Sequence, residues 1–224
     1  MLEVKDIAFA YSRRRILDGT TFSVASGETV ALVGPNGAGK TTLMRILAGL
    51  LLTGSGTIRA DGFDVRREPL RYRRLLGYLP ESSPVEPALT VKSYLKFRAK
   101  LKGEQSRKIR HRVMEALEAC ALADLGDALI GRLSNGQRRR VALAEALLLR
   151  PRFLLADDIF AGIDPEARST IVHTLSSFSQ FASIILSGHE LDELGRCSSR
   201  FLVLKDGRIR EAVGGAAARR ALTA

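Results

Sequence analysis

Nine consecutive residues have the types and the spacing that wrap a protein backbone around phosphate groups. They are Gly34, Pro35, Asn36, Gly37, Ala38, Gly39, Lys40, Thr41 and Thr42, which fit the pattern G-x-x-x-x-G-K-S/T. The glycines let the backbone approach the phosphates without Cβ clashes. Lys40 can reach the β- and γ-phosphates of a nucleotide, and Thr41 can offer its hydroxyl group to Mg²⁺.

The segments on either side of this loop are the ones that a phosphate site requires. Residues 28–33 predict a buried strand, and residues 43–51 continue with the apolar spacing of a helix. The new helix presents unpaired N–H groups and its positive dipole end to the anion. Strand, loop and helix in this order argue against the alternative, a glycine-rich turn without a chemical role.

Two further stretches carry candidate chemistry. The apolar run Phe153–Ala156 ends in Asp157 and Asp158, and a carboxylate at such a strand end can hold Mg²⁺ through water. Ser134 precedes the helical run 138–149, so Ser134, Gly136 and the free N–H groups of the helix can form a second anion site. The alternatives are a solvated acidic pair and a capped surface helix.

Composition and charge limit the class of protein. The chain has 224 residues, of which 46% are hydrophobic and 26% charged, as in a soluble globular protein. No apolar stretch approaches the ~20 residues of a spanning helix, and the charged residues 1–6 do not resemble a signal peptide. We therefore expect a cytoplasmic protein. The net charge of +11 is compatible with solvated faces, with nearby anionic lipid and, least of all, with nucleic acid.

The order of the predicted elements divides the chain. Short strands fill the amino-terminal quarter, and helical patterns run from Thr90 to about Leu133 as an inserted all-helical segment. A strand at residues 183–187 and a hairpin at Asp206-Gly207 follow, and we expect the tail 216–224 to be frayed. Cys120 and Cys197 have no metal-ligand spacing and are predicted to be reduced packing residues.

The motifs in this order resemble the ATP-binding subunit of an ABC transporter over nearly the whole chain. The resemblance rests on the phosphate loop, the helical insert, Leu133-Ser134-Asn135-Gly136-Gln137, the acidic strand end, Gly162-Ile163-Asp164-Pro165 and His189. It implies an α/β fold: a P-loop NTPase core with an antiparallel β subdomain and an inserted α-helical subdomain. Residues 1–224 would form one such domain, with residues 1–80 and 150–212 as β subdomain and core, and residues 85–149 as helical subdomain.

The resemblance assigns roles on the nucleotide's own side of the site. Tyr11 matches the aromatic residue that stacks on adenine, and residues 34–42 match the phosphate loop. Asp157 matches the carboxylate linked to Mg²⁺, and Asp158 matches the catalytic base. Glu81 lies at the position of a switch loop that contacts Mg²⁺ and the membrane partner.

Other matched residues act at the interface with a second subunit. Ser134, Gly136 and Gln137 match the signature that binds the γ-phosphate of a partner's ATP. Asp164 matches the loop that crosses this interface, and His189 matches the switch histidine. His111 and His173 match no motif and are predicted to be surface residues.

One phosphate loop and one signature in the chain imply a head-to-tail dimer, either with a copy of itself or with a homologue, around two molecules of ATP. ATP binding would close this dimer. Because the sequence predicts no spanning helix, separate transmembrane permease subunits would receive the motion of closure, and the chain would lie peripherally at the inner face of the membrane. The residues around Glu81 resemble bacterial exporters more than importers. Soluble ABC proteins that act on ribosomes or DNA resemble chains with two such domains in tandem. This sequence carries one such domain, so we expect no nucleic-acid partner.

The chain departs from the family pattern at three places. Asp158 replaces the usual Glu, Glu81 replaces the commonest Gln, and Ile159-Phe160 replaces Pro-Thr. Asp is shorter than Glu by one C–C bond, roughly 1.5 Å, and a base must lie within hydrogen-bond reach of its water. We therefore expect slow hydrolysis and a long-lived closed dimer. An ionised Glu81 keeps an oxygen for Mg²⁺ but cannot donate a hydrogen bond as Gln can.

Overall fold

The computed structural model describes residues 1–223, which form two compact units. Unit 1 consists of Met1–Glu81, Arg152–Ile159 and Ser179–Ala224, and unit 2 consists of Ser82–Pro151 and Phe160–Phe178. The sequence-based division placed residues 160–178 with the core, whereas in the structure they belong to the helical unit. The reason is that their helix contacts other helices, as described below, although they lie between two core strands in sequence.

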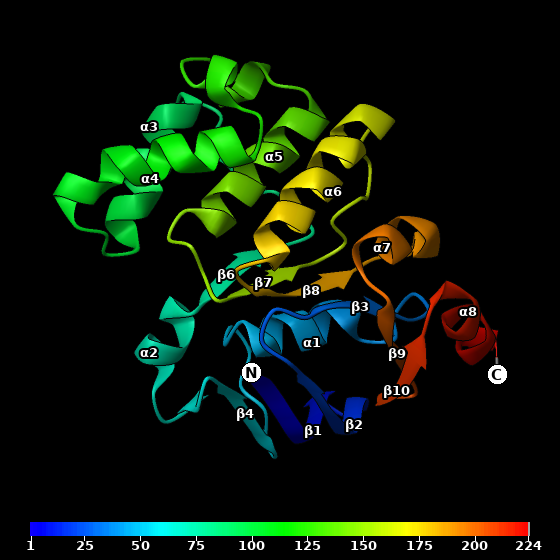
Figure 1. Cartoon of the computed structure of the whole chain (residues 1–224). Coiled ribbons are helices and arrows are strands. Elements are labelled where there is room, and N and C mark those ends of the chain that lie inside the picture. The colour runs from blue at the N-terminus through cyan, green and yellow to red at the C-terminus, as the bar shows by residue number, and fades with distance from the viewer. Residues whose placement is uncertain (224) are drawn as a thin grey trace. The chain divides into compact units, whose positions relative to one another are not determined.

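Unit 1 contains every strand within residues 1–223 (Figure 1). The strands are β1 (Leu2–Tyr11), β2 (Arg14–Val24), β3 (Thr29–Val33), β4 (Thr57–Ala60), β5 (Phe63–Asp64), β6 (Leu76–Leu79), β7 (Phe153–Ala156), β8 (Ser183–Ser187), β9 (Arg200–Lys205) and β10 (Arg208–Val213). Six of them form a sheet in the order β10-β9-β3-β8-β7-β6, which is parallel except for the β9–β10 hairpin. The carboxyl ends of β3, β7 and β8 therefore meet at one edge of the sheet.

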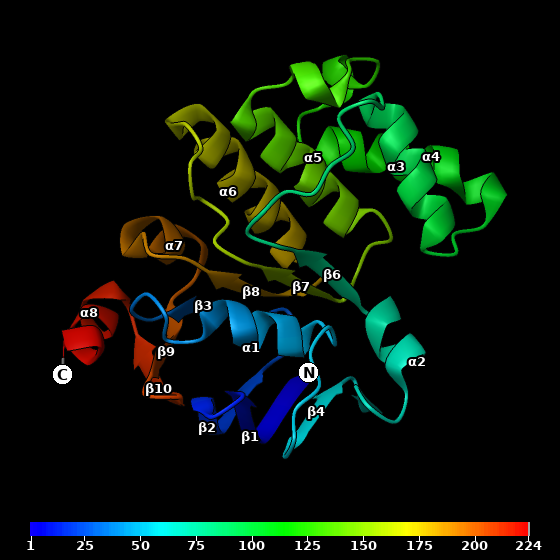
Figure 2. The ribbon, with the colours of Figure 1, turned by 180° about the vertical axis from the view of Figure 1, so that it is seen from behind.

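The other four strands form an antiparallel sheet in the order β2-β1-β4-β5. Helix α1 (Lys40–Leu47) lies between the two sheets in both views (Figures 1 and 2). Its apolar residues Leu43, Met44, Ile46 and Leu47 are buried in one core with side chains from both sheets. This burial on opposite sides fixes the amino end of α1, and with it the phosphate loop.

Three further helices belong to unit 1: α2 (Pro69–Arg74), α7 (Leu191–Cys197) and α8 (Gly215–Thr223). Helix α8 contradicts the expectation of a frayed tail, since residues 215–223 are helical and Ala218 is fully buried. An ion pair of 2.6 Å joins Arg219 of α8 to Asp192 of α7. Residue 224 lies outside the described part of the chain.

Unit 2 is helical and contains α3 (Val91–Leu101), α4 (Ser106–Ala119), the 3₁₀ turns η1 (Ala123–Leu125) and η2 (Ile130–Arg132), α5 (Asn135–Leu147) and α6 (Pro165–Ser179). The Thr174 hydroxyl of α6 donates to the carbonyl of Ala119 at the end of α4, at 2.8 Å. The nearly buried carboxylate of Glu145 on α5 forms ion pairs of 2.9 Å with Arg98 and Lys102. These contacts join α6 to α4 and α5 to α3 within the unit.

Several local expectations are confirmed. The helical segment begins at Thr90, the N-cap of α3, Ser134 caps α5, and Cys120 and Cys197 carry free thiols. None of the helices within residues 1–223 has the length and hydropathy that a bilayer-spanning segment requires. Tyr11 ends strand β1 and pairs with Arg14 across a hairpin.

Candidate functional site

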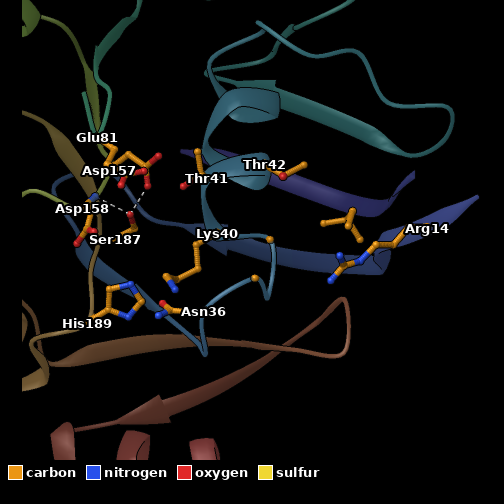
Figure 3. Close-up of a pocket in the computed structure, with 13 residues that line it drawn as sticks. Arg14, Asn36, Lys40, Thr41, Thr42, Glu81, Asp157, Asp158, Ser187 and His189 are labelled. Atoms are coloured by element: carbon orange, nitrogen blue, oxygen red, sulfur yellow. Dashed lines mark hydrogen bonds between the residues drawn. The ribbon is translucent and has the colours of Figure 1, made fainter. Parts of the chain in front are cut away.

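A cavity of about 390 Å³ in unit 1 brings the predicted phosphate loop and the predicted acidic residues together. From the loop, Asn36, Gly37, Gly39, Lys40, Thr41 and Thr42 line it. The rest of the lining is Arg14, Ile16, Glu81, Asp157, Asp158, Ser187 and His189. Figure 3 shows Lys40 in the middle, with the carboxylates on one side and Arg14 on the other. A second cavity, of about 420 Å³, lies next to Pro35, Ala38 and Arg14.

The loop reaches helix α1 through a backbone that only glycine adopts readily. Gly39 is the N-cap of α1 and has a φ of 105°. A Cβ added there would lie 2.6 Å from Cγ2 of Ile16 on strand β2, which is closer than atoms can pack. Gly39 therefore lets the loop lie directly against β2, and it directs the first N–H groups of α1 into the cavity.

The ammonium group of Lys40 turns back over the loop. It donates hydrogen bonds to the carbonyls of Gly34 at 2.8 Å and Pro35 at 3.2 Å. Burial lowers the pKa of Lys40, and the charges of Asp158, Asp157 and Glu81 partly oppose this effect. A half-buried cation beside carboxylates, held by two neutral carbonyls, has charge available for a phosphate group.

Asp157 and Asp158 lie at the carboxyl end of β7, next to the end of β8. The Ser187 hydroxyl donates to Oδ1 of Asp157 at 2.5 Å and accepts from the backbone N–H of Asp158 at 2.9 Å (Figure 3). Asp157 is only 1% exposed, so this bond orients a carboxylate that has almost no contact with solvent. Ser187 thus positions both acidic residues.

Asp158 has two unusual properties. Its φ of 45° is in the left-handed region, which Asp adopts more readily than most residues with a Cβ. Burial raises the pKa of its carboxyl group; His189 lowers it, while Glu190, Glu81 and Asp157 raise it further. A carboxylate with a raised pKa binds a proton more strongly, which suits a group that must take a proton from water.

The donor set at the acidic end fits Mg²⁺ only in company with a phosphate. Within residues 1–223, no group of three or more His, Cys, Asp and Glu side chains is arranged to hold a metal ion by itself. Thr41, Glu81 and Asp157 nevertheless line one cavity beside Lys40. Mg²⁺ is usually bound by one or two carboxylates together with substrate phosphates and water. This chemistry matches a cation that arrives with a nucleotide.

Two predicted residues contribute less directly to the cavity. Tyr11 does not line it; the residue is 45% exposed, and its ring packs edge-on against Phe9, with the ring centroids 4.9 Å apart. Gly34 is buried beneath the loop, where an added Cβ would meet the carbonyl oxygen of Leu204. His189 has an exposed side chain at the cavity wall, whereas His111 and His173 are exposed on α4 and α6, as expected.

In unit 2, the predicted signature residues begin helix α5 as a capping box. The Ser134 hydroxyl accepts from the backbone N–H of Gln137 at 3.2 Å, and Oε1 of Gln137 accepts from the backbone N–H of Ser134 at 2.9 Å. Ser134 is exposed, and its hydroxyl proton is not used by this cap. It can therefore donate to an external anion.

Gly136 packs against the first turn of α6 in the same unit. Asp164 caps this turn by accepting from the backbone N–H of Ala167 at 2.9 Å, and this bond lowers the pKa of Asp164. A Cβ at Gly136 would lie 2.6 Å from the Cβ of Ala167 and 2.9 Å from Oδ2 of Asp164. Gly136 thus joins the signature segment to the Asp164 segment.

We expect the Gly136→Ala variant to be destabilised by about 1–3 kcal/mol, because the new methyl group overpacks this contact. Urea unfolding followed by circular dichroism measures the effect. Gly54→Ala is the matched control, since nothing lies within 4 Å of its Cβ position and its φ is not in the left-handed region. Equal unfolding midpoints for Gly136→Ala and the native chain would contradict the expectation.

Sequence reasoning missed three residues that line the cavity: Ser187, Arg14 and Ile16. Ser187 had a partial signal, because it is the polar end of an apolar strand, but only the structure shows that this strand lies beside the acidic strand. Arg14 is the middle one of three consecutive arginines, and sequence alone does not distinguish it from its neighbours. Ile16 resembles any other residue of a strand.

Known proteins match this chain along most of its length. A family model described as ABC transporter matches residues 17–161. The uncharacterized ABC transporter ATP-binding protein YxlF of Bacillus subtilis (strain 168) is 34% identical over 209 residues, which are 93% of this chain and 69% of that protein.

A second relative and a solved structure agree with these matches. The Nod factor export ATP-binding protein I of Paraburkholderia xenovorans (strain LB400) is 35% identical over 208 residues, 92% of this chain and 68% of that protein. A structure described as the ATP binding subunit of an ABC transporter superposes with a TM-score of 0.85 at 31% identity, over 95% of this chain and 90% of its own.

Proposed function

The chain belongs to the ABC transporter family of ATP-binding proteins, and from this premise we propose that it binds and hydrolyses ATP to drive an exporter. The observation that carries the proposal is a single cavity that combines the Lys40 ammonium, the Thr41 hydroxyl and the carboxylates of Asp157 and Asp158. Phosphoryl transfer to water needs cations that bind the phosphates and carboxylates that bind Mg²⁺ and the attacking water.

The predicted residues on the nucleotide's own side of the site each have one task in this proposal. Lys40 and the N–H groups of the loop bind the β- and γ-phosphates, while Thr41, Glu81 and Asp157 would hold Mg²⁺. When bound, Mg²⁺ neutralises charge that develops on the phosphate oxygens. Asp158 accepts the proton of the attacking water, and His189 lies at the cavity wall, where the γ-phosphate would end. Tyr11 offers an exposed ring for the adenine base.

The site is completed by a second chain. One chain carries one phosphate loop and one signature, so we propose that Lys40 of one subunit and Ser134 of another hold the same ATP. ATP then closes a head-to-tail dimer, either of two copies or of this chain with a homologue, and hydrolysis removes the bridging phosphate. Separate transmembrane permease subunits receive this motion at the inner face of the membrane. The likeness to a Nod factor export protein supports export as the direction.

Hydrolysis in this dimer is proposed to be slow, because Asp158 has a shorter side chain than Glu. A chain that binds ATP but hydrolyses it weakly could also work beside a competent homologue. Steady-state ATPase activity of the purified chain separates the two cases, since only a competent subunit turns over alone.

ATP-driven pairing tests the proposal directly. In an Asp158→Asn background, which blocks hydrolysis, we expect MgATP to double the molar mass measured by light scattering, whereas MgADP should not. Ser134→Ala in that background should abolish the doubling, because the donor to the γ-phosphate is lost.

Thr90→Ala is the matched control for Ser134→Ala. Both residues cap a helix of unit 2, and each substitution costs about 1 kcal/mol of helix stability. Pairing that persists in Ser134→Ala, or that disappears equally in Thr90→Ala, would show that Ser134 has no specific part in the dimer. A molar mass of the Asp158→Asn chain that does not respond to MgATP would contradict the proposed function itself.

A further inference from the structure

Three consecutive arginines enter strand β2, and their surroundings differ. Arg15 forms an ion pair of 2.9 Å with Asp18. Arg13 lines neither of the two cavities beside the phosphate loop. Arg14 lines both of them, and no hydrogen bond or ion pair engages its guanidinium within residues 1–223. A cation that faces a cavity without a protein partner is available to an anionic ligand.

The fold determines which way Arg14 faces. Ile16 on β2 lies against Gly39, the residue that begins α1. Arg14, two residues before Ile16, lines the same two cavities as Ile16, so both side chains face the loop. Pairing with Tyr11 closes the hairpin at Arg14, and a hydrogen bond of 2.8 Å from the N–H of Asp18 to the carbonyl of Gly207 holds the strand.

Arg14 and the acidic residues lie at opposite ends of the cavity, with Lys40 between them (Figure 3). Glu81, Asp157 and Asp158 repel a phosphate unless Mg²⁺ accompanies it, so the Mg²⁺-bearing β- and γ-phosphates belong at their end. The remainder of a nucleotide bound to Lys40 then extends toward Arg14. The first anionic group on that side is the α-phosphate.

We propose that Arg14 is a nucleotide-binding residue whose guanidinium group binds the α-phosphate end of the nucleotide, opposite the Mg²⁺ end. This inference rests on the proposed function, because it needs a nucleotide in this cavity. Arg14 is then the second cation of the site. It lies on the antiparallel sheet, whereas Lys40 begins the helix that follows a strand of the parallel sheet. The nucleotide would thus be held between the two sheets of unit 1.

The test compares the binding of MgATP and MgADP to Arg14→Gln, measured by isothermal titration calorimetry. We expect both affinities to fall by the same factor, about five- to tenfold, because both nucleotides carry the α-phosphate and because solvent weakens an exposed charge pair. Added salt should weaken binding more in the native chain than in the variant. Arg14→Lys keeps the charge but loses the planar guanidinium group, so its nucleotide affinity should lie between those of the native chain and Arg14→Gln.

Arg13→Gln is the matched control, since it removes the same charge one residue away and should change affinity less than twofold. Equal losses in both variants would mean general attraction by positive charge, and a loss confined to MgATP would mean a γ-phosphate contact; either result overturns the inference. The inference is also overturned if Arg14→Gln binds both nucleotides as tightly as the native chain does, while Lys40→Ala binds them weakly. If the native chain binds no nucleotide, the proposed function fails as well.

Discussion

The Lys40→Ala variant is expected to bind MgATP at least about 100-fold more weakly than the native chain, which corresponds to about 2.7 kcal/mol. Lys40 is the one lysine that lines the cavity within residues 1–223, and its ammonium already donates to two loop carbonyls. A nucleotide would replace these neutral acceptors with charged phosphate oxygens, which form hydrogen bonds about twice as strong. Loss of the ammonium removes that gain and leaves the nearby carboxylates unopposed.

Fluorescence titration with a labelled ATP analogue measures this loss. Lys5→Ala is the control, because Lys5 is an exposed lysine of β1 whose charge is equal and whose ammonium group pairs loosely with Glu3 at 3.7 Å. Lys40→Arg should recover only part of the affinity, since the larger guanidinium group does not fit the loop. Native-like affinity in Lys40→Ala would contradict the phosphate site and everything built on it.

The Asp158→Asn variant should lose at least about 100-fold in ATPase turnover, the usual contribution of a general base. It should bind MgATP as well as the native chain does, because the γ-phosphate contacts remain. Asp158→Glu should hydrolyse faster than the native chain, since its longer side chain brings the carboxylate closer to the water. Phosphate release at saturating ATP measures all three rates.

Dependence on pH gives a second readout of the same residue. The folded chain raises the pKa of Asp158, so the base is protonated, and activity is lost, at a higher pH than an ordinary Asp would allow. A raised pKa also means that the folded state holds this proton more tightly than the unfolded state. The contribution to stability is therefore present at low pH and is lost as pH rises through the folded pKa.

At neutral pH, Asp158→Asn should therefore raise the urea midpoint while turnover falls. A residue with only a structural role would not give this combination. Asp158→Asn with native turnover would exclude Asp158 as the base. An Asp158→Glu variant no faster than the native chain would show that Asp158 already reaches the water, and would end the proposal of slow hydrolysis.

Sequence identified those parts of the site that depend on local pattern. The phosphate loop, the cap at Ser134 and the acidic end of β7 each need only a few neighbouring residues, whose types fix the backbone or the charge. Propensity also located most of the strands. It failed at the tail, which was expected to be frayed, because the burial of Ala218 and the ion pair between Arg219 and Asp192 depend on distant parts of the chain.

What only the tertiary structure decided is which residues face one another. Arg13, Arg14 and Arg15 are alike in sequence, yet within residues 1–223 only Arg14 lines both cavities without an ion-pair partner, because the contact of Ile16 with Gly39 places this end of β2 against the loop. Ser187 meets Asp157, 30 positions away in sequence, because the parallel strands β7 and β8 lie side by side. The sequence by itself determined that a phosphate site exists; folding determined its walls, because side-chain encounters depend on sheet order rather than on chain order.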